Sequence, residues 1–402
     1  MLRMFLISLS CNVVLLCSCL SSFAVPIASS ASPSTTVAPI SFPYQAGWLG
    51  ADSAYSIPLG GGRDLWLFGD TFVGNRNAST RRQRTGMPRN SVGIAQCTSG
   101  KYTIQYYWSQ MYTPTPKSFF DTGTSDWYWP MDGFVWNGRL YLMLERMHAH
   151  GSGAFGFAYS GVSLATISNY TVPPDQWKVS YQTVLTGDTA IPGTSIVVGQ
   201  GANGNPYPAD LNGAAYAYFF TNSAASRHSH YSALTRLPLA SLAQAAQSAG
   251  HWQYLSSSGW TAWTAAAGMP TNATHVLDVG PTEFTVRYHS SPAGKAGTWL
   301  AVMPSATYLN KRGLYSVSSS INGPWSTPAT LYRYPEMKSG NPNYTPNVFC
   351  YADKEHPELE STGSLTFTYA CNSIVEDEVF NNMNLYNPVV VTMPQPPASK
   401  LK

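Results

Sequence analysis

The chain has few charged side chains, and the two signs nearly cancel. Asp, Glu, Lys and Arg make up 11% of its 402 residues, with 23 basic against 20 acidic side chains. Soluble domains usually carry about 25%. Long exposed helices held by ion pairs are therefore excluded. A basic stripe for a phosphate backbone is also missing, so we expect no nucleic-acid partner.

Long apolar runs and sustained helical periodicity are missing after the N-terminus. The exception is that terminus, where Arg3 precedes an apolar run from Met4 to about Leu20 and small residues follow. This pattern predicts a signal peptide over 1–24, a Ser/Pro/Thr-rich linker over 25–40 and one domain over 41–395. We expect a secreted monomer without a membrane span. The alternative is a lipid anchor at Cys19, because Leu16–Cys19 distantly resembles a lipoprotein cleavage box.

Cysteine is scarce, and half of it lies in the predicted leader. Removal of Cys11, Cys17 and Cys19 leaves three residues. Cys350 and Cys371 are 21 residues apart and flank an expected hairpin, so we predict that they form a disulfide and that Cys97 stays free. No zinc-ligand spacing is present, and we expect neither a metal nor a cofactor.

Short β-rich runs alternate with Gly, Pro and Asn turns through the rest of the chain, which indicates an all-β fold. Five similar runs begin 74, 76, 83 and 66 residues apart: Asp64–Thr71, Gly138–Arg146, Ala214–Asn222, Gly297–Ser305 and Gly363–Cys371. One strand type at a regular long period is typical of radial repetition. We therefore predict a five-bladed β-propeller with four-stranded antiparallel blades.

An acidic residue precedes each repeated strand near a turn: Asp52, Asp132, Asp210, Glu283 and Glu358. In a propeller the innermost strands line a central channel, and their starts face one mouth. We expect these acids to converge there, where a ligand should bind.

Blade one also carries a family resemblance. The run Gly50-Ala-Asp-Ser-Ala-Tyr-Ser-Ile-Pro-Leu59, then Leu65-Trp-Leu-Phe-Gly-Asp-Thr-Phe72 and Arg89-Asn-Ser-Val92, resembles five-bladed propeller glycoside hydrolases, most closely the endo-D-arabinanase group and its uncharacterised relatives. The likeness extends from Phe42 to about Asn382. It implies hydrolysis of furanosidic glycans at the channel mouth. Related propellers place a base on blade one, a supporting Asp on blade two and an acid Glu further round, which match Asp52, Asp132 and Glu283 by position.

Glycosidic cleavage independently requires two carboxyl groups in different protonation states. Asp52 and Asp70 are 18 residues apart and bracket one hairpin, so both can reach the same face. Gly69 beside Asp70 permits close approach. We predict Asp52, Asp70 and Glu283 as the catalytic residues. A turn-capping role is the alternative for Asp70.

Two further polar positions have two interpretations each. Glu283, Thr285 and Arg287 share one strand face, so Arg287 either pairs with Glu283 or holds a substrate hydroxyl. Asp132 is either a turn residue before Gly133 or a ligand for sugar hydroxyls.

Aromatic residues are abundant, at 13% of the chain. Trp127 and Trp129 precede Asp132 in a polar segment and could stack on a sugar, although packing between blades is the commoner fate of Trp. The substrate-binding set that we predict is Asp132, Trp127, Trp129, Arg89, Asn90, Arg287 and His356.

The sequence thus favours a secreted glycoside hydrolase of arabinan-type glycans, D-arabinan included, whose partner is a polysaccharide or oligosaccharide. A carbohydrate-binding propeller without activity is the alternative. A polysaccharide lyase is disfavoured, because the weak positive charge offers little to neutralise a uronate.

Overall fold

The computed structural model describes residues 40–396, except for 77–81, 99–100, 112, 154, 188–189, 199–215, 224–230, 247–249, 264–267, 279–282, 290–296 and 308–309. The predicted signal peptide and linker, Asp210 and the lipid-anchor alternative at Cys19 lie outside these residues. Among the described residues, no helix has the length and apolarity needed to cross a bilayer.

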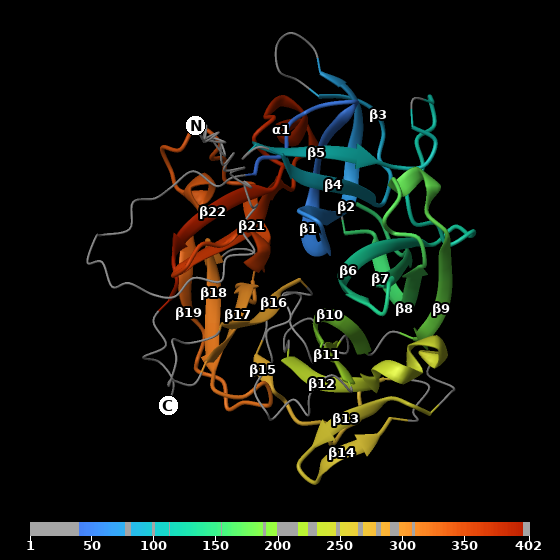
Figure 1. Ribbon diagram of the computed structural model, residues 1–402. Helices are drawn as coiled ribbons and strands as arrows, with labels where there is room; N and C mark the ends of the chain where they lie inside the picture. The colour runs from blue at the N-terminus through green and yellow to red at the C-terminus, as the bar shows by residue number, and fades with distance from the viewer. Residues whose placement is uncertain are drawn as a thin grey trace, which may run out of the picture.

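Five antiparallel sheets surround a common axis, and Figure 1 looks along that axis. Blade one contains β1 (Trp48–Gly60), β2 (Arg63–Arg76), β4 (Ser91–Thr98) and β5 (Lys101–Tyr107), with β3 (Arg82–Gly86) paired to β2. Blade two contains β6 (Trp127–Trp136), β7 (Arg139–Ala149), β8 (Phe157–Ile167) and β9 (Val179–Thr186).

Of the remaining blades, blade four keeps four strands, whereas blades three and five do not among the described residues. Blade three contains β10 (Ala190–Val198), β11 (Tyr216–Ser223), β12 (Tyr231–Pro238), β13 (Gln253–Ser256) and β14 (Gly259–Ala262), with β15 (Leu277–Asp278) paired to β12. Blade four contains β16 (Thr285–His289), β17 (Thr298–Pro304), β18 (Arg312–Ser318) and β19 (Ala329–Arg333). Blade five contains β20 (Val348–Glu355), β21 (Ser364–Ser373) and β22 (Val389–Pro394).

Helical structure is confined to short connections in the described chain. These are α1 (Glu376–Asn381) and the short 3-10 helices η1 (Pro174–Gln176), η3 (Leu239–Gln244), η6 (Pro335–Met337) and η7 (Pro357–Leu359). The predicted all-β, five-bladed propeller is confirmed. The number of strands per blade varies, and blade five has three among the described residues.

The repeated strands of the sequence are the second strands of the blades, namely β2, β7, β11, β17 and β21. They read as nearly continuous apolar runs because neighbouring blades cover both of their faces. In β7, for example, Leu140, Leu142 and Met143 are all fully buried. The period was therefore detectable because every blade needs one strand that is buried on both sides.

Side chains, rather than a strand shared by the first and last blades, join those blades in the described chain. Strands β1–β5 all belong to blade one and β20–β22 all belong to blade five. Arg82 crosses this junction fully buried: its Nε donates to the Leu49 carbonyl at 2.7 Å and its Nη1 to the Asn382 carbonyl at 3.0 Å. Lys354 of blade five donates to the Ser53 carbonyl of blade one at 2.6 Å.

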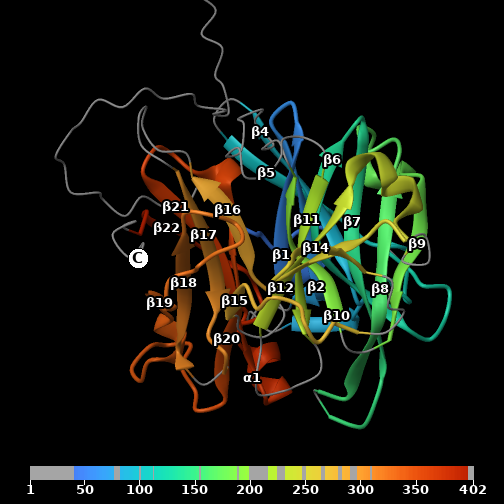
Figure 2. The same ribbon diagram turned by 90° about the horizontal axis from the view of Figure 1, so that it is seen from below.

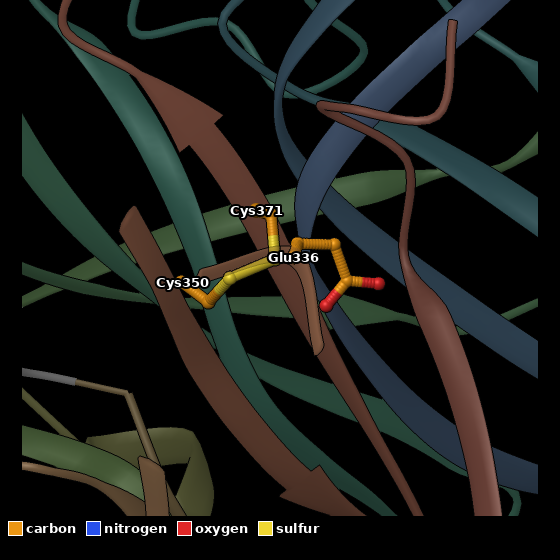
Figure 3. A group of neighbouring side chains, drawn as sticks. All are labelled: Glu336, Cys350 and Cys371. Atoms are coloured by element: carbon orange, nitrogen blue, oxygen red, sulfur yellow. A yellow bond between two sulfur atoms is a disulfide. The ribbon is translucent and has the colours of Figure 1, made fainter. Parts of the chain in front are cut away.

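The predicted disulfide is present in blade five. Cys350 and Cys371 are directly opposite in β20 and β21, their Cα atoms are 4.0 Å apart and their sulfur atoms are bonded (Figure 3). The expectation that Cys97 stays free is wrong, because Cys97 is also disulfide-bonded.

Replacing both Cys350 and Cys371 by Ala should destabilise the fold. Closing a loop of 21 residues restricts the unfolded chain by about 3 kcal/mol, which corresponds to a fall in Tm of roughly 4 °C for a domain of this size. Differential scanning calorimetry with and without reductant would measure it. An equal Tm for the variant and the oxidised wild type would contradict the prediction.

Candidate active site

Four of the five inner strands bend at the same depth in the channel. The ladder with the second strand shifts register between Ala51 and Ser53 in β1, and equivalent shifts occur at Pro130/Gly133 in β6, Pro192/Ser195 in β10 and Tyr351/Lys354 in β20. A bulge re-aims a side chain that regular alternation would direct elsewhere. Asp52, Asp132 and Asp353 all lie in these bulges, so the bulges position acids at the axis.

Asp52 is the best-supported catalytic candidate. Its Oδ2 accepts a hydrogen bond from the Tyr351 hydroxyl of blade five at 2.7 Å. A Cβ on Gly69 would lie 2.5 Å from its Oδ1, so only glycine leaves room for this carboxyl group. Burial, with the charges of Glu283 and Asp70, raises the pKa of Asp52 to about 8 against the opposing effects of Tyr351 and Lys354.

The backbone around Asp52 is held by the junction of blades one and five. Gly50 has a φ of +129°, and a Cβ there would meet the Tyr386 carbonyl oxygen at 2.2 Å. The Tyr386 amide donates to the Cys371 carbonyl at 2.6 Å, which ties this segment to the disulfide hairpin. Arg82 also donates to the neighbouring Leu385 carbonyl. The position of Asp52 therefore depends on residues more than 300 positions away.

Asp70 lies beside Asp52 on β2 and has a different environment. Its Oδ2 forms an ion pair with Arg89 Nη1 at 3.0 Å, and its Oδ1 accepts from Trp129 Nε1 at 3.0 Å. The Arg89 guanidinium in turn stacks on the Trp127 ring at 4.4 Å from the centroid. Burial raises the pKa of Asp70, although Arg89 and Trp129 oppose this. Three of the predicted binding residues thus surround one predicted catalytic acid.

Glu283 lies just before β16 and faces Lys354 rather than Arg287. Lys354 Nζ is 3.3 Å from Glu283 Oε1, and the Glu283 side chain remains 22% exposed. Lys354 itself is fully buried and lies 4.6 Å from the centre of the Tyr55 ring. Burial lowers the pKa of Lys354, while the charges of Glu283 and Asp52 raise it. This lysine is the buried cation between the two acids.

Glu145 completes the group and was missed by sequence reasoning. It is buried on β7, and burial together with the charge of Glu283 raises its pKa to about 8. A single acid directly after the apolar run Leu140–Leu144, within the same strand, was the available signal. The prediction had considered only the acids in the turns that precede the repeated strands.

Asp132 and Arg287 form a separate pair across the axis. Arg287 Nη1 of blade four lies 3.0 Å from Asp132 Oδ2 of blade two, and Asp132 is 1% exposed. The backbone amides of Ile196 and Gly133 also donate to Asp132, each at 2.8 Å. One interpretation of the sequence expected Arg287 to pair with Glu283. Arg287 pairs with Asp132 instead. Asp132 is fully occupied by protein donors and supports the channel wall.

Two of the predicted substrate-binding residues are enclosed by protein. His356 is fully buried, with Nδ1 2.6 Å from Ser56 Oγ and Nε2 2.8 Å from Thr368 Oγ1. Asn90 is also fully buried and bridges the Phe120 and Tyr128 carbonyls at 2.9 and 2.8 Å. Protein groups therefore engage both side chains in the described structure, and their role in substrate binding stays a prediction.

Two groups of described side chains have metal-ligand proximity. In the first, shown in Figure 3, Glu336 lies near Cys350 and Cys371, whose sulfur atoms are already bonded to each other. In the second, the donor atoms of His289, Glu355 and Glu360 lie within 4.8 Å. Burial lowers the pKa of His289, but the charge of Glu355 at 2.6 Å outweighs it and raises the pKa to about 9. A charged His289 accounts for this group as an ion pair.

Two pockets in the described surface lie away from these acids. One, of about 190 Å³, is lined by residues including His275, Asp278 and Trp325, and the other, of about 270 Å³, lies beside α1. Neither is lined by Asp52, Asp70 or Glu283. The candidate site is defined by the ionisable groups that converge at the axis. Carboxyl groups with perturbed pKa values in a channel indicate chemistry more strongly than the presence of a pocket does.

The fold and site define a class: a five-bladed propeller with carboxyl groups from blades one, two and four gathered at its axis. The chain belongs to the family described as "Domain of unknown function (DUF5005)", whose model matches residues 42–393. No curated protein matches the chain by sequence.

Solved structures resemble the chain to different degrees. A "putative hydrolase" from Bacteroides ovatus superposes with a TM-score of 0.64 at 18% identity, covering 86% of each chain. An exo-beta-1,3-galactanase from Phanerochaete chrysosporium gives a TM-score of 0.45 at 11% identity over 90% of this chain and 64% of its own. A xylan beta-1,4-xylosidase from Bacillus halodurans gives 0.41 at 11% identity, over 84% and 52%. At these identities the likeness concerns the fold.

Asp52→Asn should make the protein more stable than wild type at high pH. A folded-state pKa near 8 means that the native state binds a proton that the unfolded chain has already lost, so wild-type stability falls as pH rises from about 4 to 8. The amide carries no such penalty. We expect nearly equal stability at pH 4 and a gain on the order of 5 kcal/mol for the variant at pH 9.

Urea unfolding at both pH values would measure this gain. Asp175→Asn is the matched control, because Asp175 is an exposed acid on η1. A variant gain that does not grow with pH would show that Asp52 is ionised in the native protein at neutral pH.

Proposed function

We propose that this protein is a glycoside hydrolase that cleaves furanosidic, arabinan-type glycans, D-arabinan among them. One observation carries the proposal: Asp52, with its pKa raised to about 8, lies near Glu283, which is held by a buried lysine. Glycosidic cleavage needs such a pair, one carboxyl protonated and one ionised. The weakly charged chain suits a neutral glycan, and the arabinan preference rests on the blade-one resemblance.

The local charges favour a division of labour between the acids. Asp52 holds the proton and donates it to the leaving glycosidic oxygen. Glu283, which pairs with Lys354 at 3.3 Å, activates water or attacks the sugar carbon. This reverses the roles that the family resemblance implies, in which blade one supplies the base. Asp70 keeps Asp52 protonated through its charge and, with Arg89 and Trp129, faces the sugar.

We also propose that the protein is exported and acts as a monomer outside the cell. The N-terminal pattern of basic, apolar and small residues supports export. A disulfide in blade five suits an oxidising compartment.

Removing a catalytic carboxylate should abolish turnover without unfolding the chain. We expect Asp52→Asn and Glu283→Gln each to lower kcat/KM by about 10³-fold or more, since each removes a group that acts in the transition state. Asp70→Asn should have a smaller effect. The assay is release of reducing ends from D-arabinan, L-arabinan, β-1,3-galactan and xylan, with Asp175→Asn as the control.

Retention of full activity in both variants would contradict the assignment. Binding of one of these glycans without any product, measured by affinity electrophoresis, would instead favour the carbohydrate-binding alternative.

The pH profile should have an alkaline limit set by Asp52. Because the pKa of Asp52 is raised to about 8, the proton donor is lost as pH rises through that value and kcat/KM should fall about tenfold per unit above it. A profile of kcat/KM from pH 5 to 10 would measure this limit. Activity that rises through pH 8 would indicate that ionised Asp52 is the working form.

A further inference from the structure

Five aromatic side chains link Asp70 to Asp52 through two other blades. Trp129, whose indole donates to Asp70, has its ring 4.7 Å from Phe157, and Phe157 is 6.4 Å from Phe155. Phe155 is 6.4 Å from Phe349, and Phe349 stacks at 5.5 Å on Tyr351, whose hydroxyl donates to Asp52. We call these five residues the aromatic bridge: Trp129, Phe157, Phe155, Phe349 and Tyr351.

The contact between Phe155 and Phe349 joins blades that are not neighbours. Phe155 lies in the turn between β7 and β8 of blade two, and Phe349 lies near the start of β20 in blade five. Blade one, which carries both aspartates, separates these blades in the ring (Figure 1). The β7–β8 turn and α1 follow strands that end at the same face, which Figure 2 shows from the side. The turn must therefore lean over the mouth to reach blade five.

Phe155 has an unusual environment for a large apolar side chain. It is 56% exposed, whereas Phe349 beneath it is 9% exposed. Exposed aromatic rings at a mouth lined with polar groups are typical of surfaces that bind ligands with an apolar face, as sugars have. The bridge thus combines sugar-stacking rings with direct hydrogen bonds to both blade-one acids.

We propose that the β7–β8 turn, between Ala149 and Phe157, is a specificity-determining segment that confines the site to the ends of glycan chains. Blade one closes the site on one side of Asp52 and Asp70, and the aromatic bridge closes it on the other. A polysaccharide cut internally must continue past the carboxyl groups in both directions. The terminal sugar instead stacks against Phe155, and short products leave from the chain end. This inference rests on the proposed function.

The decisive variant shortens the turn. Residues 150–156 are replaced by Asn-Gly, which favours a two-residue hairpin between the paired residues Ala149 and Phe157. Phe155→Ala removes only the ring, and Tyr181→Ala is the control because Tyr181 is a 41% exposed aromatic on the outer strand β9. The probe is whichever of D-arabinan, L-arabinan, β-1,3-galactan and xylan the wild type hydrolyses, and folding is checked by circular dichroism.

Wild type should release one short product while the polymer's mean length, measured by size-exclusion chromatography, stays nearly constant. The shortened variant should cut internally. Its mean polymer length should therefore fall at least tenfold more per bond cleaved than that of wild type. Phe155→Ala should raise KM about fivefold with kcat within about twofold, and Tyr181→Ala should match wild type.

Two results would overturn the inference while leaving the proposed function in place. One is internal cutting by wild type from the first bonds cleaved. The other is a folded, active shortened variant with the wild-type product pattern. Failure of wild type to hydrolyse any of the four glycans would instead overturn the proposed function, and this inference with it.

Discussion

Repulsion among carboxyl groups at the ring axis is the constraint on which the site depends. Three acids from three different blades meet here: Asp52, Glu145 and Glu283. The charge of Glu283 raises the pKa of the other two. Like charges held close in a poorly solvated channel cannot all ionise at neutral pH. Protons must therefore remain on some of them, and Lys354, fully buried, stabilises the negative charge that is left. The result is a stored proton beside a carboxylate.

Closure of the ring and placement of the site are the same structural problem here. Blade one and blade five meet through side chains and the segment around Tyr386, whose carbonyl oxygen occupies the space that Gly50 leaves open. Arg82 satisfies several backbone carbonyls that would otherwise be buried without donors at this junction. Because Asp52 lies two residues beyond Gly50, the contacts that close the propeller also orient its leading acid. A loosened junction should therefore affect chemistry before it affects the other blades.

The acids at the axis divide into reactive and supporting groups according to their donors. Asp132 receives two backbone amides and a guanidinium, so its oxygens are occupied by protein. The Tyr351 hydroxyl donates to Asp52, and the charged groups that act on Asp52 are Glu283, Asp70 and Lys354. Position in the sequence repeat is the same for both residues, and the difference arises from which neighbours reach across the channel. That contrast explains why a resemblance that matches residues by position can identify the members of a site and still leave their roles open.

The architecture and part of the site could be predicted from the amino-acid sequence. Second strands buried on both faces must be apolar throughout, so their period was visible, and with it the five blades and the pairing of Cys350 with Cys371. Asp52, Asp70 and Glu283 could be proposed from turns and from the blade-one motif. The other features of the site depend on tertiary packing. Register shifts in the inner strands, the reach of Arg287 to Asp132 and the burial of His356 follow from packing between blades. Such contacts join residues far apart in the chain, and a local pattern carries no record of them.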